Sequence, residues 1–152
     1  MLNKLFDYFE KKVTPSGSSE TIELPEQTLI LAATALMIEV ARSDENKATV
    51  ELEVISEILV SKLGVDPIEG QLILDAAEEK SEEAHDLFQF TELINQNFSK
   101  DEKQDLIYFM WKVAFSDGNI DKYEDHIIRR ISGLINLSHS DFIRLKLKAR
   151  DG

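Results

Sequence analysis

The sequence predicts an all-α fold, a helical bundle of about seven or eight helices with an internal pseudo-twofold repeat. Apolar residues recur at helical spacing along most of the chain, and no stretch of any length alternates apolar and polar residues as a half-buried strand would. Signals that start and stop helices recur as well. At 152 residues, 43% of them hydrophobic and 30% charged, the chain is long enough to bury a sizeable core.

The chain divides into a leading segment, residues 1–25, and a single helical domain, residues 26–152. A helix over residues 2–12 places apolar side chains on one face and lysines elsewhere: Leu2, Leu5, Phe6 and Phe9, and Lys4, Lys11 and Lys12. A Pro/Gly/Ser-rich linker, TPSGSSETIELPE, follows. We expect this amphipathic helix to pack on the domain rather than to contact a membrane, because Asp7 and Glu10 oppose anionic lipid.

Two segments, residues 26–43 and 100–116, are apolar almost all round, which predicts central, buried helices. Residues 86–98 supply one more amphipathic helix. Gly64 is placed to end the helix before it. Three helix starts carry capping signals: Asp66 with Pro67 and Glu69, Ser99 with Glu102, and Ser138 with Asp141.

The domain also repeats itself. The segment ARSDENKATVELEVI (41–55) aligns with AFSDGNIDKYEDHII (114–128). Each half contains a buried helix, an acidic turn, an amphipathic helix, a stop and a further helix, the stops being Gly64-Val65 and Asn136-Leu137. We expect a pseudo-twofold axis that packs the two apolar helices together, brings the two acidic turns close and leaves residues 86–98 between the halves.

The two acidic turns are the candidate functional site. Asp44 and Glu51 keep the seven-residue spacing of Asp117 and Glu124. Oxygen ligands without histidine or cysteine suit Ca²⁺, Mg²⁺ or Mn²⁺ better than Zn²⁺. The predicted metal ligands are Asp44, Glu51, Asp117, Asn119, Asp121 and Glu124.

A simpler alternative explains the second turn without a metal. Asp121 and Glu124 match a capping box, and Asp117-Gly118 is an ordinary turn pair in which glycine takes a positive φ. This alternative does not explain the first turn, because Ala48 stands where the second turn has Asp121 and offers no side-chain acceptor. Both interpretations are open at this stage.

A complete EF-hand loop is excluded at the second turn. When Gly118 takes the obligatory sixth position, Glu124 falls on the twelfth, as an EF-hand requires. The first and third positions then fall on Val113 and Phe115, whose side chains cannot coordinate Ca²⁺. A metal at this turn would therefore need ligands from elsewhere, and the first turn is the natural source.

We expect structural rather than functional roles for several other residues. Glu39 and Lys112 occupy matching places in the two apolar helices, and we expect a partly buried ion pair between them, with Glu39 as an added metal ligand as the alternative. Three aromatic residues at helical spacing are expected in the core: Phe109, Trp111 and Phe115. The histidines share no metal-ligand spacing and are expected at the surface: His85, His126 and His139.

The second half carries a family resemblance. The stretch VAFSDGNIDKYEDHIIRRISGLINLSHSDF resembles the TerB-like, tellurite-resistance-associated family, in which an Ala-x-x-Asp-Gly turn precedes an acidic helix start and a hydrophobic helix ending in Leu-Gly/Asn-Leu-Ser. The preceding DLFQFTELINQNFSKDEKQDLIYFMWKVAF is similar to the uncharacterised bacterial branch of that family. The resemblance covers roughly residues 26–150. It implies an all-helical, pseudo-symmetric fold, a bacterial cytoplasmic setting and an acidic metal site.

Charge and composition exclude several classes of function. The net charge of −12 argues against nucleic-acid binding, which needs a positive surface. Residues 51–105 hold 15 acids and 4 bases, whereas residues 126–152 hold 6 bases and 2 acids. We expect a solvated mixed surface, and the alternative is that the acidic middle and the basic end pair with each other or with a partner. The chain has no cysteine, and no apolar run reaches membrane-spanning length, so we expect a cytoplasmic protein.

The function that we expect is non-enzymatic. No nucleophile–base pair or phosphate-binding motif is recognisable, so the sequence predicts a helical scaffold associated with stress and tellurite resistance, with a divalent cation in the acidic turns and an unidentified protein partner. Two alternatives are open. One is a metal-dependent hydrolase that uses the same carboxylates. The other is a pure protein-interaction domain without metal.

Overall fold

The computed structural model describes residues 26–42, 48–83, 87–118, 120 and 122–151. Within these residues the secondary structure is helical and no strand occurs. The elements are α2 (Glu26–Arg42), α3 (Ala48–Ser61), α4 (Pro67–Glu83), α5 (Phe88–Asn97), α6 (Lys100–Ala114), the 3₁₀-helix η1 (Phe115–Asp117), α7 (Lys122–Leu134) and α8 (His139–Asp151). The predicted all-α fold is confirmed. The helix predicted over residues 2–12 and the linker after it lie outside the described residues.

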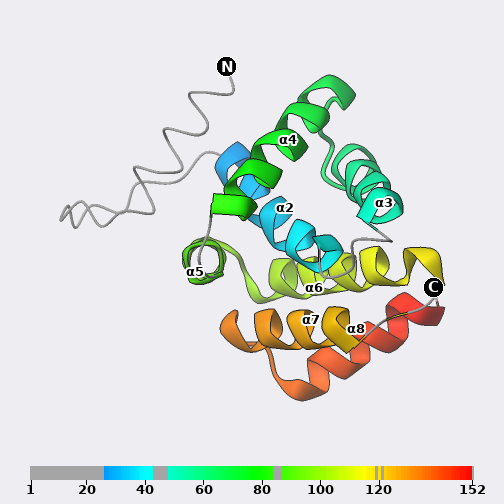
Figure 1. Cartoon of the computed structure of the whole chain (residues 1–152). Coiled ribbons are helices and arrows are strands. Elements are labelled where there is room, and N and C mark those ends of the chain that lie inside the picture. The colour runs from blue at the N-terminus through cyan, green and yellow to red at the C-terminus, as the bar shows by residue number, and fades with distance from the viewer. Residues whose placement is uncertain (1–25, 43–47, 84–86, 119, 121, 152) are drawn as a thin grey trace.

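Helix α2 is the centre of the fold. It contacts five other helices, α3, α4, α5, α6 and α7 (Figure 1). From Leu31 to Ala41 every side chain except that of Glu39 is buried. A helix that is apolar all round can bury its whole surface in this way only when neighbours cover every face. The prediction of a central, buried helix over residues 26–43 is therefore confirmed, with the helix ending at Arg42.

Helix α6 is buried along only part of its length. Its second half packs into the core, and the buried residues are Leu106, Ile107, Met110, Trp111, Val113 and Ala114. Its first turns carry exposed charged residues, among them Asp101, Glu102 and Asp105. The expectation that residues 100–116 are buried all round was therefore wrong for the first six residues, where charged side chains keep their hydration by facing solvent.

The predicted N-cap side chains accept hydrogen bonds from backbone amides at all three helix starts, and the reciprocal bond of a capping box is present at one of them. Ser99 and Glu102 make a complete capping box at the start of α6: the Glu102 amide donates to Ser99 Oγ over 3.2 Å, and the Ser99 amide donates to Glu102 Oε1 over 2.9 Å. At the start of α4, the carboxylate of Asp66 accepts from the amide of Ile68 over 3.1 Å. At the start of α8, the Asp141 amide donates to Ser138 Oγ over 3.1 Å.

Asp141 also contacts a cation. Arg144, one turn further along α8, donates to Asp141 Oδ1 over 3.2 Å. This hydrogen bond, joined by the neighbouring Ser138 hydroxyl, holds the pKa of Asp141 below its ordinary value, although partial burial works in the opposite direction. The acid therefore stays ionised at the positive end of the helix dipole.

The two halves end their second helices in the same way. Gly64 after α3 and Asn136 after α7 are both left-handed, with φ of 68° and 66°. Glycine and asparagine are the residues that tolerate this conformation at a helix end. The next residue in each half, Val65 or Leu137, is 9% exposed and donates its amide back to a carbonyl of the preceding helix. These matched stops confirm the predicted repeat.

Contacts between helices repeat in the two halves as well. Helix α2 packs against α3 and α4, as α6 packs against α7 and α8. Helices α2 and α6 contact each other, α2 also contacts α7, and α6 also contacts α3. Figure 1 shows α2, α3 and α4 on one side of α6 and α7 and α8 on the other. Helix α5 contacts α2 and α7, so it lies between the halves as predicted.

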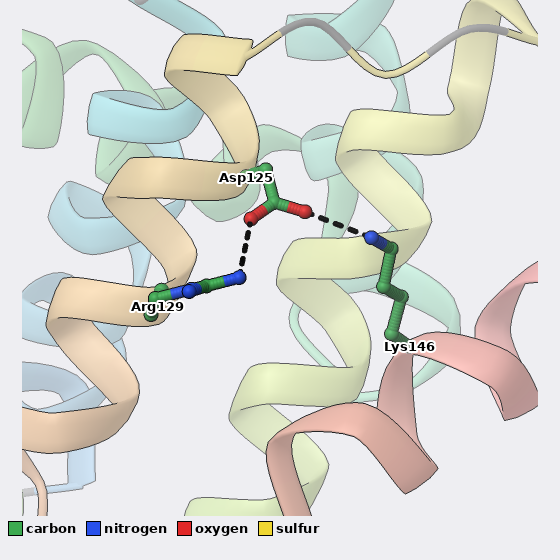
Figure 2. A network of polar contacts seen from close by, with 3 residues as sticks. All are labelled: Asp125, Arg129 and Lys146. Carbon is green, nitrogen blue, oxygen red and sulfur yellow. Dashed lines mark hydrogen bonds and ion pairs between the residues drawn. The ribbon is translucent and has the colours of Figure 1, made fainter. Parts of the chain in front are cut away.

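Polar contacts hold α8 against α6 and α7. Asp125 of α7 accepts from Lys146 of α8 over 2.8 Å and from Arg129 over 3.5 Å (Figure 2). The Lys146 ammonium lies 5.1 Å from the Trp111 ring centre, and the Trp111 and Phe142 rings are 5.2 Å apart. The buried Trp111 of α6 is thus covered by an aromatic ring and a cation that both come from α8.

Candidate functional site

The candidate site is built around two buried glutamates at matching positions of the repeat. Glu51 lies in the first turn of α3 and Glu124 in the first turn of α7. Both side chains are 0% exposed. Acidic residues are almost never fully buried unless they are paired or bind a metal, so one such pair at equivalent positions is a strong signal.

The helix pattern explains why these two carboxylates point inward. Glu51 shares a helical face with Ile55 and Ile58, four and seven residues later, and both isoleucines are buried. Glu124 has the same relation to Ile128 and Ile131. Each glutamate therefore occupies the first position of an apolar stripe, and packing of the stripe carries the carboxylate into the interior.

Complete burial of these carboxylates carries a large desolvation cost. A carboxylate near a helix N-terminus is stabilised by about 0.3–1 kcal/mol, whereas desolvating one ion costs several kcal/mol. The difference has to be supplied by hydrogen bonds, a proton, a cationic side chain or a metal ion. Buried glutamates in both halves thus mark a place where hydrogen bonds, a proton, a cationic side chain or a metal ion must replace the lost hydration.

The second acidic turn has the local structure that the sequence predicts. After α6 the chain makes the 3₁₀-helix η1, and Gly118 follows with φ of 91° and donates its amide to the Phe115 carbonyl over 2.9 Å. The Ser116 hydroxyl donates to the Val113 carbonyl over 2.7 Å. The positive φ accounts for glycine at this position, because an L side chain rarely adopts it.

The turn lies against the other half of the repeat. Element η1 contacts α3, the helix that begins directly after the first acidic turn and carries Glu51 in its first turn. The second turn and the equivalent helix of the first half are thus neighbours in the fold, although they are far apart in sequence.

The described residues contain only part of the predicted ligand set. Glu51 and Glu124 are placed and buried. Asp117 contributes backbone to η1, but its side chain lies outside the described part of the structure. Asp44, Asn119 and Asp121 also lie outside it, and with them the proposed Asp121 capping box. Among the residues that are described, no three acidic or histidine side chains are grouped so as to hold a metal ion.

Comparison with known proteins identifies the family. The model of the family described as "Tellurite resistance protein TerB" matches residues 30–147, most of the chain. The chain belongs to the TerB family. No curated protein and no solved structure was found to match it.

The TerB match spans both acidic turns and both buried glutamates. It begins within α2 and ends within α8, so it includes the central helix of each half. Family membership confirms the resemblance seen in the sequence and supports a helical domain associated with tellurite resistance. No helix in the described ranges of this TerB protein combines the length and the apolar character that crossing a membrane requires.

The ion pair expected between the two central helices is not formed. Glu39 of α2 accepts a hydrogen bond from the Ser81 hydroxyl of α4. Lys112 of α6 instead lies with its ammonium 5.6 Å from the centre of the Tyr108 ring, one turn earlier in the same helix. The sequence comparison paired Glu39 and Lys112 because they are equivalent in the repeat, but equivalent positions need not face each other. Ser81 carries no sequence signal that would have revealed its partner.

The predictions for the three core aromatic residues and for two of the three histidines are borne out. Trp111 is fully buried, and Phe109 and Phe115 pack against the core. His126 and His139 are exposed, and His85 lies outside the described residues. Neither of the two described histidines belongs to a group of acidic and histidine side chains that could hold a metal ion.

Proposed function

We propose that this TerB-family domain is a non-catalytic binding module that holds a divalent cation between its two acidic turns. The observation that carries the proposal is the complete burial of Glu51 and Glu124 at equivalent places in the two halves. One buried acid can be an accident of packing. Two at repeat-related positions, each beside an acidic turn, favour a shared task.

The chemistry of the donors supports a hard cation. Glu51 and Glu124 supply carboxylate oxygens, and the turns add the acids and the asparagine at positions 44, 117, 119 and 121. Ca²⁺ takes six to eight oxygen ligands and Mg²⁺ takes six, whereas Zn²⁺ favours nitrogen and sulfur. We therefore expect Ca²⁺, Mg²⁺ or Mn²⁺, with the two glutamates as the innermost ligands and the turns closing the site.

A module of this kind would act as a scaffold in a cytoplasmic response to stress such as tellurite. Metal binding would tie the second turn to the start of α3 and so fix the two halves in one arrangement. The surface presented to a protein partner would then depend on the metal. A metal that stabilises only the folded state shifts the folding equilibrium by mass action.

The test is a metal titration of the chelator-treated protein. Calorimetry and thermal unfolding are measured with Ca²⁺, Mg²⁺ and Mn²⁺, each up to millimolar concentration. At about a hundredfold above Kd, binding should raise Tm by about 5–10 °C. Glu51→Gln and Glu124→Gln should remove the shift, and Glu53→Gln, an exposed acid on the same helix as Glu51, should retain it.

Three results of these experiments would refute or change the proposal. No heat and no thermal shift with any of the three metals would refute the metal site. A shift that survives in both glutamine variants would place the ion elsewhere. Metal-dependent hydrolysis of a model phosphoester, lost in Glu124→Gln, would replace the non-catalytic module by a metal-dependent hydrolase.

A further inference from the structure

An open groove lies on the domain, away from the buried glutamates. It has a volume of about 240 Å³ and is formed by α2, the turn that follows α3, the α5–α6 connection and α6. Most of its lining is apolar and includes Ile30, Met37, Leu63, Phe98, Leu106 and Phe109. Four of these, Ile30, Leu63, Phe98 and Phe109, are only partly buried and pack against the core from its edge.

The rim of the groove is charged. Glu102 and Asp105 of α6 and Lys62 at the end of α3 line it, and all three residues are exposed. The rim thus has an excess of negative charge around an apolar floor. A partner that fits such a site is an amphipathic segment with large apolar side chains on one face and lysines beside them.

We propose that the groove is the docking site of this chain's own residues 2–12. That segment carries Leu2, Leu5, Phe6 and Phe9 on one helical face and Lys4, Lys11 and Lys12 outside that face. The apolar face matches the floor, and the lysines match the acidic rim. This inference does not depend on the metal site proposed above.

The length of the connecting chain permits this docking. Residues 13–25 join the segment to α2, and Leu29 and Ile30, within the first turns of α2, already line the groove. A random-coil chain of thirteen residues has a root-mean-square span of about 20 Å, more than enough to return to a site next to its attachment point. Such a short tether gives an effective concentration in the millimolar range, so even weak docking is populated.

The volume suits a small number of large side chains. An engineered cavity of about 150 Å³ holds a benzene ring, so a groove of about 240 Å³ accommodates one or two aromatic or leucine side chains. Phe6 and its neighbour Leu5 are the natural candidates, because they lie in the middle of the apolar face. The outer two apolar residues would cover the rim rather than enter the groove.

The experiment is cysteine cross-linking in the full chain, which contains no native cysteine. Glu10→Cys is combined with Lys62→Cys at the rim of the groove and treated with a short bismaleimide. The matched control combines Glu10→Cys with Leu147→Cys, which is 41% exposed on α8 and does not line the groove. Docking predicts about tenfold more cross-linking within one chain for the Lys62 pair than for the Leu147 pair.

Two further variants test which contacts matter. Adding Leu5→Asp and Phe6→Asp should reduce the Lys62 cross-link to the level of the control. Asp105→Lys should lower its rate about two- to fivefold, as expected for an exposed charge pair. Asp101→Lys, on the same helix but outside the groove, should leave the rate unchanged. Circular dichroism confirms that each variant is folded.

Equal cross-linking of the two pairs, or a Lys62 cross-link that survives the Leu5→Asp and Phe6→Asp changes, would overturn the proposal. Cross-links that join two chains instead of one would also overturn it, because they would make a second copy the occupant of the groove.

Discussion

Replacing Lys146 by methionine tests how α8 is held on the domain. Methionine keeps the apolar stem of the side chain but removes the ammonium, which lies 2.8 Å from Asp125 Oδ2 and 5.1 Å from the Trp111 ring centre. The side chains of Lys146 and Asp125 are 31% and 24% exposed, so this pair is better shielded from water than a typical surface ion pair.

The expected loss follows from these two contacts. An exposed ion pair contributes about 0.2–1 kcal/mol, and a cation over an aromatic ring about 0.5–2 kcal/mol, depending on desolvation. Lys146→Met should therefore lower the free energy of unfolding by about 1–2 kcal/mol. For a chain of this size, that corresponds to a decrease in Tm of about 2–8 °C.

The assay is thermal and urea unfolding followed by circular dichroism, because fluorescence of Trp111, the single tryptophan, is itself altered when the cation leaves its ring. A double-mutant cycle with Asp125→Asn isolates the ion pair. We expect a coupling free energy of about 0.5–1 kcal/mol at low salt and a smaller value at 1 M salt. A coupling below about 0.3 kcal/mol at low salt would show that the pair does not hold α8, since distant, independent sites add to within that error.

Two further predictions concern α8. Phe142→Ala removes a ring that is 1% exposed and packs on Trp111, so it should cost about 3–5 kcal/mol in unfolding experiments, whereas Leu147→Ala, at a 41% exposed position of the same helix, should cost less than about 1 kcal/mol. Because the pKa of Asp141 is lowered in the folded state, its contribution to stability is present at neutral pH and is lost as the pH falls below about 4 through the folded pKa. The stability of Asp141→Asn should therefore fall less steeply with acid than that of the wild type in urea unfolding between pH 5 and 2; equal slopes would contradict the assignment.

Much of the fold could be read from local pattern. Ser99 and Glu102 predicted the start of a helix, and Gly64 and Asn136 predicted the ends of two helices. Such predictions are possible because a helix cap depends on residues only a few positions apart. The apolar character of residues 26–43 predicted a buried helix, since few other environments accept such a segment. These signals are short-range, and the structure confirms them.

The candidate site could be predicted only in part. The repeat singled out four of the 29 acidic residues, Asp44, Glu51, Asp117 and Glu124, and the structure buries the two whose side chains it describes, Glu51 and Glu124. Periodicity explains this outcome, because each glutamate continues an apolar stripe. The repeat also predicted an ion pair between Glu39 and Lys112, and the structure does not form this pair. Residues related by an internal repeat occupy equivalent environments, but whether they touch depends on their distance from the symmetry axis.

No pattern in the sequence predicted the groove. Its lining comes from α2, α3, the α5–α6 connection and α6, and no local pattern marks those residues as neighbours. Its acidic rim combines residues on α6 with a lysine at the end of α3. The same holds for Asp125 and Lys146, which are 21 residues apart and meet only because α7 and α8 pack together.

The sequence by itself determined the helices of this TerB-family protein, their ends and the two-part repeat, because each depends on interactions within one or two turns of chain. Only the tertiary structure decided which side chains meet: Glu39 with Ser81, Lys146 with Asp125 and Trp111, and the residues around the groove. The physical reason is that helix formation is local, whereas contacts between helices depend on how their buried faces fit together.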